Sequence, residues 1–240
     1  MIFLAVTMGF FAESYREYSV EKSSAKEYAR SLVGDLKKDT AMVGIDIAQI
    51  NIIRSEIDSL SAFLKGKKIN DLNNAEVFVY TQENCEYRPY TWSRATLDEI
   101  KSSGSLRYFS NDSIVMRISA YDALTKHMDE DFIGDEQRSD KLTEKRNRIV
   151  DLNYSLSYRG FTWRTNPDSI RRIILREINN GQPHLQLLTD NINDIKSLLN
   201  DYLQIKGQLN SRGKHELPNP VQDASELIMG LRKEYHLKDE

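Results

Sequence analysis

The sequence predicts an all-α protein whose long helices pack as an antiparallel bundle or a coiled-coil-like stalk, with a partial transmembrane helix at the N-terminus. Three observations support this prediction. Apolar residues recur every seven positions over long stretches, charged residues make up 29% of the 240-residue chain, and only 5 residues are proline. A seven-residue apolar repeat is typical of helices that pack along one another at a shallow angle. Only Val77–Tyr80 resembles a strand, and it is too short and isolated to build a sheet.

Residues 1–12 carry no charged side chain and are expected to contact a membrane. The anchoring residues are predicted to be Ile2, Phe3, Leu4, Val6, Phe10 and Phe11. Because a spanning helix needs about 20 apolar residues, we interpret the segment as the distal part of a transmembrane helix that starts upstream. Tyr15 and Tyr18 lie where an interfacial aromatic belt is expected. Two alternatives are a short anchor in the membrane interface and a helix buried in a soluble core.

Residues 13–66 are expected to form one long helix. Its seam positions are Ala29, Leu36, Val43, Ile50, Ile57 and Leu64, with Leu32, Ile53 and Leu60 as companions. Two seam positions hold Asp39 and Asp46. Because an unpaired buried carboxylate is costly, we expect the seam to be open to water there, or Ile47 to take the buried position. The alternative is a pair of buried carboxylates that bind an ion or set the register with a partner.

Shorter and later helices follow from local signals. Thr96–Glu99 reads as a capping box that opens a helix over 93–103, which Gly104 ends. A second long pattern covers 112–158, either as one long helix or as two helices in line that a kink or short loop near Gly134 separates. Asn166 and Pro167 start a helix expected over 167–180.

The clearest heptad pattern covers 185–212, with Lys206 as its one polar exception. Its seam is predicted to contain Leu185, Leu188, Ile192, Ile195, Leu199, Tyr202 and Leu209. A last amphipathic helix is expected over 221–236, with an apolar face of Ala224, Leu227, Ile228, Leu231 and Tyr235. Residues 13–240 are therefore expected to form a helical domain outside the membrane.

No group of residues in the sequence indicates catalysis. The single cysteine, Cys85, excludes an internal disulfide framework and a multi-cysteine zinc site. His127–Asp131 and His236–Glu240 have helical metal-site spacing, but one such pair is a weak signal. We expect no enzyme, no cofactor and no metal. The net charge of −3 argues against a nucleic-acid binder, which normally carries a basic surplus.

Tyr87, Tyr90 and Trp92 form an aromatic-rich stretch. Exposed together, they would make a surface for a partner or a ligand such as a peptide. The favoured interpretation is that they cover the end of the bundle, where large side chains fill the space between helices.

The stretches Phe3–Glu17 and Lys26–Asp39, the latter with an S-L-x-x-D-L-x-x-D pattern, resemble an uncharacterised family of single-pass membrane proteins from Bacteroidota. Leu97–Arg107 and Ala224–Tyr235 carry the same resemblance. It implies one transmembrane helix followed at once by a charged helical domain. It also implies a location in the bacterial inner membrane, with the helical domain in the periplasm. No catalytic residue is known for the family.

The expected role is structural: a membrane-anchored scaffold or an accessory subunit of a membrane protein assembly. The expected partners are the lipid bilayer and either further copies of the chain or another membrane protein. Self-association is expected because seams this long exceed what one short bundle can bury. The alternative is a ligand- or peptide-sensing module that signals through its membrane helix.

Overall fold

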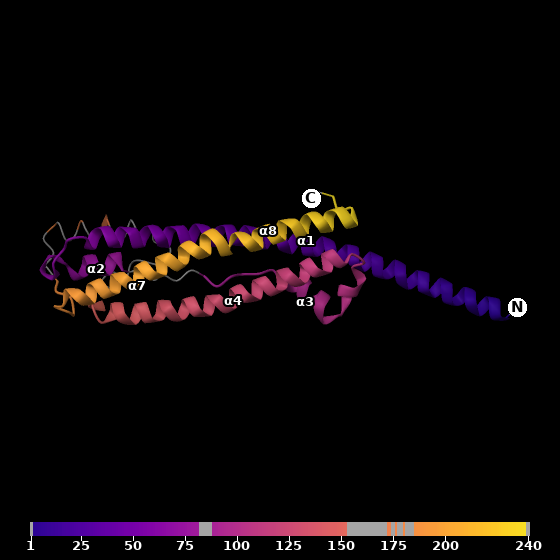
Figure 1. Ribbon diagram of the computed structural model, residues 1–240, viewed down its shortest axis with the longest axis horizontal. Coiled ribbons are helices and arrows are strands. Elements are labelled where there is room, and N and C mark those ends of the chain that lie inside the picture. The colour runs from indigo at the N-terminus through magenta and orange to yellow at the C-terminus, as the bar shows by residue number, and fades with distance from the viewer. Residues whose placement is uncertain are drawn as a thin grey trace. The chain divides into compact units, whose positions relative to one another are not determined.

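The computed structural model describes residues 2–81, 88–152, 172–173, 176, 180 and 185–238. Every regular element in these residues is helical, which confirms the predicted all-α class (Figure 1). The α-helices are α1 (Ile2–Leu64), α2 (Asn74–Tyr80), α3 (Ala95–Ser102), α4 (Asp112–Asn147), α7 (Ile192–Ser211) and α8 (Pro218–Tyr235). Short helical turns connect them at η1 (Ile69–Asp71), η2 (Ser105–Tyr108) and η4 (Arg212–Glu216).

Contacts divide the chain into two compact units, and α1 and α4 each contribute to both. Unit 1 comprises Met1–Ile45, Tyr90–Asp129 and Glu216–Glu240. Unit 2 comprises Asp46–Pro89 and Glu130–His215.

The core of unit 1 lies among α1, α3, α4 and α8. The predicted seam residues Ala29, Leu32 and Leu36 of α1 are buried there, and so is the predicted apolar face of α8 apart from the partly buried Ile228. The later seam residues are buried as well, except Leu64, which is half-buried. Asn111 donates to Glu234 and Arg117 to Glu226, at 3.0 and 2.5 Å, so α4 and α8 run in opposite directions. Fully buried members of this core include Ala29, Leu36, Ile100, Ile118, Leu227 and Leu231.

The short helix α3 ends as predicted but begins differently. Gly104 follows it with φ +70, in the left-handed region that glycine adopts without strain. The predicted capping box is wrong, because α3 starts at Ala95 and its N-cap, Arg94, makes no side-chain cap. The Thr96 hydroxyl instead donates to Asp35 Oδ2 of α1 at 2.6 Å. The Thr96 hydroxyl thus bonds to a residue of another helix and not to the backbone at the start of α3.

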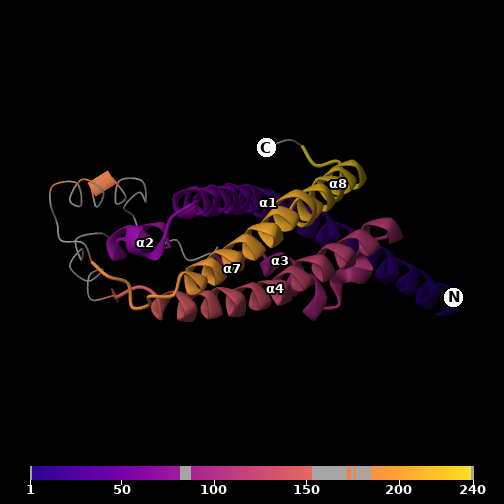
Figure 2. The same cartoon turned by 60° about the vertical axis from the view of Figure 1, so that its left-hand side comes forward.

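In unit 2, α7 runs beside the second part of α4 (Figures 1 and 2). Lys145 Nζ lies 2.5 Å from Asp201, and Arg212 Nη2 lies 2.8 Å from Asp135. Residue numbers along α4 therefore rise as those along α7 and η4 fall, so the two segments run in opposite directions. Helix α4 continues through Gly134 and ends at Asn147, so of the two alternatives the uninterrupted helix is the one observed near Gly134. Residues 148–150 form a turn after α4, so the helix stops short of the predicted end, and 153–158 and nearly all of 167–180 lie outside the described residues.

Helix α7 begins at Ile192, seven residues later than predicted. The preceding segment is held by backbone bonds to other parts of unit 2: Leu185 O accepts from Asn74 N at 2.8 Å, and Leu188 N donates to Ile149 O at 2.9 Å. The seam also differs, since Leu198 and Ile205 are buried in place of Leu199 and Lys206. Both frames follow the three- and four-residue spacing of a helix face, and the observed one replaces Lys206 with the apolar Ile205.

The strand-like segment Val77–Tyr80 belongs to α2. Asn73 caps this helix by accepting a hydrogen bond from Ala75 N at 3.0 Å. Val77 and Val79 are buried, and the Tyr80 ring stacks on Phe63 of α1 with centroids 4.1 Å apart. Capping and packing thus override the β-propensity of the two valines.

Candidate functional site

The apolar N-terminal segment of α1 is exposed. Phe3 is 85% exposed, and Phe10 and Phe11 are each 73% exposed; Val6 is exposed as well. No described side chain before Ala25 is buried, and Figure 1 shows this part of α1 extending beyond α3 and α8 of unit 1. The side chains of Ile2 and Leu4 lie outside the described set. The alternative of a helix buried in a soluble core is therefore wrong for these residues.

The exposed apolar side chains of this segment are not confined to one narrow stripe. An α-helix turns about 100° per residue, so Phe3 and Met8 point about 140° apart, as do Val6 and Phe11. All four are exposed. No helix in the described part of the chain combines the length and the hydropathy that a bilayer span requires.

The predicted aromatic surface is present only in part. Tyr87 lies outside the described residues. Tyr90 and Trp92 lie together in unit 1, with ring centroids 5.6 Å apart. Tyr90 is buried, and the half-buried Trp92 donates from Nε1 to Asp129 Oδ1 of α4 at 2.9 Å. Tyr90 therefore contributes to packing, and Trp92 alone of the two keeps a partly exposed ring.

The aspartates of the S-L-x-x-D-L-x-x-D pattern are buried, so the expected water-filled seam at Asp39 is wrong. Asp39 is 2% exposed and accepts hydrogen bonds from Ser93 N at 2.6 Å and Tyr121 Oη at 2.8 Å. Four residues earlier, Asp35 accepts from Thr96. These bonds compensate the cost of removing the carboxylates from water. Burial and the neighbouring Asp39 charge raise the pKa of Tyr121, which keeps its hydroxyl protonated as a donor.

A second cluster of charges in unit 1 surrounds Asp122. Lys101 pairs with Asp122, Lys126 Nζ lies 3.0 Å from it, and Arg94 reaches both Asp122 and Asp129. Burial raises the pKa of Asp122, but the hydrogen bonds from the two lysines outweigh burial and hold it below its ordinary value. The carboxylate is thus ionised and paired, as expected of a group that ties α3 to α4. The arrangement offers no activated nucleophile or general base.

Asp46 is also buried, whereas Ile47 is only half-buried, so the expected exchange between them is wrong. Burial raises the pKa of Asp46, and the charge of Arg88 offsets part of this. Folding then favours the protonated form, so the ionised carboxylate destabilises the fold above the raised pKa. As the pH falls below the ordinary aspartate pKa of about 3.9, this unfavourable contribution disappears.

Asp46→Asn is therefore expected to be at least as stable as the wild-type chain at pH 7. Its advantage should shrink as the pH falls towards the ordinary aspartate range. Urea denaturation of both proteins at pH 7 and at about pH 4, near the ordinary aspartate pKa, measures this difference. A variant that is less stable at pH 7 would show that the ionised carboxylate makes favourable contacts.

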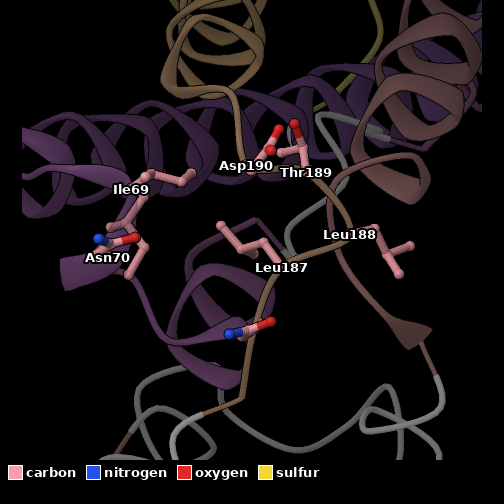
Figure 3. A pocket seen from close by; sticks show the side chains of 8 residues that line it. Ile69, Asn70, Leu187, Leu188, Thr189 and Asp190 are labelled. Atoms are coloured by element: carbon pink, nitrogen blue, oxygen red, sulfur yellow. The ribbon is translucent and has the colours of Figure 1, made fainter.

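Unit 2 contains an open pocket of ≈670 Å³ between η1 and the segment before α7. Figure 3 shows Ile69 and Asn70 of η1 on one side of it and Leu187 opposite them. Thr189 at its edge donates to Asp194 at 2.5 Å, which contributes to the start of α7. The lining mixes aliphatic and neutral polar side chains, with Asp190 as its only charge. This composition does not select a ligand class.

A smaller pocket of ≈270 Å³ in unit 1 was not expected from the sequence. Helix α1 contributes Lys26, Arg30 and Lys37. A second group comes from Arg232 of α8 and from His236 and Lys238, which follow the helix. The spacing of the α1 cations is visible in the sequence, but their meeting with residues about 200 positions away depends on the fold. We call this the basic pocket.

Metal ligands are not grouped in the described residues: no three His, Cys, Asp or Glu side chains lie close enough to hold an ion. The geometry of the described chain thus offers an exposed apolar helix end, paired buried carboxylates and a basic pocket. No protein-family model, curated protein or solved structure matches the chain.

Proposed function

We propose that the protein is a membrane-anchored helical scaffold or accessory subunit of a membrane assembly, without catalytic activity. The observation that carries this proposal is the exposed apolar start of α1, joined to a charged, well-packed helical unit. We further propose that the packed helices form an antiparallel bundle, since α4 runs opposite to α8 in unit 1 and opposite to α7 in unit 2. The family resemblance favours an inner-membrane location with the helical units in the periplasm.

A lipid bilayer fits the start of α1 better than a second protein chain. A helix that packs on one partner needs one apolar stripe, whereas a helix that is apolar all round is covered on all sides. Phe3 and Met8 point about 140° apart and both are exposed, which is wider than one narrow stripe. Burying a phenylalanine side chain contributes about 1.5 to 3 kcal/mol, so three phenylalanines supply a substantial membrane affinity.

The residues after the apolar segment match a membrane interface. Tyr15 and Tyr18 are both exposed. Aromatic side chains with a polar end favour the headgroup level of a bilayer. Glu13 and Arg16, which form an exposed ion pair at 2.5 Å, mark the level at which charge begins. We propose that the bilayer boundary lies between Ala12 and Tyr18.

The triple substitution Phe3→Ser, Phe10→Ser, Phe11→Ser is expected to reduce flotation of the chain with phosphatidylcholine vesicles at least tenfold. The reason is the loss of most of the apolar area that would enter the bilayer. The matched control is Met116→Ser with Met229→Ser, since both methionines are exposed on other helices of unit 1. The control should float like the wild-type chain.

Equal flotation of the triple variant and the wild-type chain would contradict the anchor. Light scattering without vesicles tests the other explanation, in which the exposed segment packs against a second copy of the chain. If the wild-type chain forms oligomers that the triple substitution dissolves, and does not bind vesicles, the segment covers a second copy of the chain. A strictly monomeric chain in detergent at all concentrations would contradict the self-association expected from the long heptad seams.

A further inference from the structure

A third pocket, of ≈370 Å³, lies in unit 1 where the exposed apolar start of α1 ends. Tyr18 lines this pocket and also belongs to the apolar surface around Met8, Phe11 and Tyr15. We propose that the pocket holds the headgroup of a zwitterionic phospholipid whose acyl chains lie along that surface. This assignment rests on the proposed membrane anchor, since it names the lipid that the end of the anchor contacts. We call the site the headgroup pocket.

One face of α1 connects the apolar surface to the headgroup pocket. Met8, Phe11, Tyr15 and Tyr18 follow one another at spacings of three and four residues, and each is at least 60% exposed. Ala25 stands seven residues after Tyr18, lines the pocket and is buried in the core of unit 1. A lipid on this face would therefore meet apolar side chains first and the packed unit at its polar end.

The headgroup pocket presents charges of both signs. Lys22, Lys26 and Arg107 supply cations, and Glu21 and Glu234 supply carboxylates. A zwitterionic headgroup carries a phosphate and an ammonium within a few bonds of each other, so each of its charges finds an opposite charge in such a lining. An anionic headgroup without an ammonium would leave the carboxylates facing a like charge. The complementarity needs no surplus of either sign.

Aromatic rings in the same pocket suit the ammonium group. Tyr18, Tyr108 and Tyr235 all line it. A cation is attracted to the face of an aromatic ring, and quaternary ammonium ligands are recognised in this way. The Arg107 guanidinium lies 5.3 Å from the centroid of the Tyr108 ring, so this ring already takes part in a cation–π contact.

The hydroxyl of Tyr235 gives a further reason to expect a polar ligand. Tyr235 is 8% exposed, and its Oη has no hydrogen-bond partner among the described residues. Burial and the charge of Glu234 raise the pKa of Tyr235, so the hydroxyl stays protonated as a donor. A buried donor without an acceptor is unfavourable. A phosphate oxygen in the pocket that Tyr235 lines would supply one.

Native mass spectrometry of the full chain in a neutral maltoside detergent tests the assignment. The chain is offered equal amounts of phosphatidylcholine and phosphatidylglycerol with the same acyl chains. Both lipids carry the phosphate, and only phosphatidylcholine carries the ammonium. The wild-type chain should retain phosphatidylcholine at least fivefold over phosphatidylglycerol.

Two variants separate the two charges of the headgroup. Glu21→Gln removes a carboxylate that would face the ammonium, so the preference for phosphatidylcholine should fall below twofold. Arg107→Gln removes a cation that would face the phosphate, so retention of both lipids should fall at least threefold. Glu17→Gln is the matched control, because Glu17 is a glutamate of α1 one turn earlier that does not line the pocket. It should retain both lipids like the wild-type chain.

Equal retention of the two lipids by the wild-type chain would overturn the assignment. The same holds if Glu21→Gln and Glu17→Gln show the same preference, since Glu21 would then only neutralise neighbouring cations. Failure of the membrane anchor gives a different result, because the anchor is measured by flotation of the phenylalanine variant. A chain that needs its phenylalanines to float but shows no lipid preference would keep the anchor and lose the headgroup pocket.

Discussion

Replacing Asp39 with alanine is expected to lower the free energy of unfolding by about 3 kcal/mol. The carboxylate accepts hydrogen bonds from Ser93 N and Tyr121 Oη, and the substitution leaves both donors without this acceptor. Each buried donor that loses its partner costs about 1 to 3 kcal/mol. Urea denaturation followed by circular dichroism measures the change.

Two comparisons separate this effect from a general loss of an aspartate. Asp140→Ala removes an exposed carboxylate from the interior of α4 and should change stability by less than about 0.5 kcal/mol. Tyr121→Phe removes one of the two donors and should cost about 1 kcal/mol. If Asp39→Ala were as mild as the exposed control, Asp39 would have to be solvated in the folded protein.

The second large effect is expected at Arg212 in unit 2. Its side chain is 8% exposed and lies 2.8 Å from Asp135 and 3.5 Å from Asp131. Arg212→Ala should destabilise the protein by about 3 kcal/mol, because removing one partner of a buried pair leaves the other charge poorly compensated. Arg138, which lies 2.6 Å from Asp135, limits the cost but does not replace the buried contact.

Lys214→Ala is the control for Arg212, since Lys214 belongs to the same turn, η4, and is exposed. It should leave the midpoint of urea denaturation nearly unchanged. Arg212→Met separates charge from packing, because methionine keeps much of the apolar stem. A methionine variant as stable as the wild-type chain would show that the side chain acts through packing and not through its charge.

Much of the helical framework is predictable from local patterns. The burial of Leu36, Val43 and Ile50 follows from their seven-residue spacing, because this spacing places them on one face that packs against any neighbouring helix. The left-handed Gly104 and the apolar face of α8 are likewise local signals. The exposure of the N-terminal apolar segment was not determined by these signals, since the same residues also suit a buried helix.

The polar interior is where prediction from the sequence fails. Asp39 carries no sign of its partners, because Ser93 and Tyr121 are 54 and 82 residues away along the chain. The capping box at Thr96 fails for the same reason, since its hydroxyl bonds to Asp35, 61 residues away. The basic pocket combines two groups of cations, each unremarkable on its own helix.

The sequence by itself therefore determined that the described chain is helical and which edge of α1 turns inward, because both depend on neighbours within a few turns. Only the tertiary structure decided the seam of α7, the burial of Asp35, Asp39 and Asp46, and the meeting of cations from α1 and α8. The physical reason is that hydrophobic periodicity depends only on residues of the same helix. Satisfaction of a buried charge depends instead on donors that other segments bring to it.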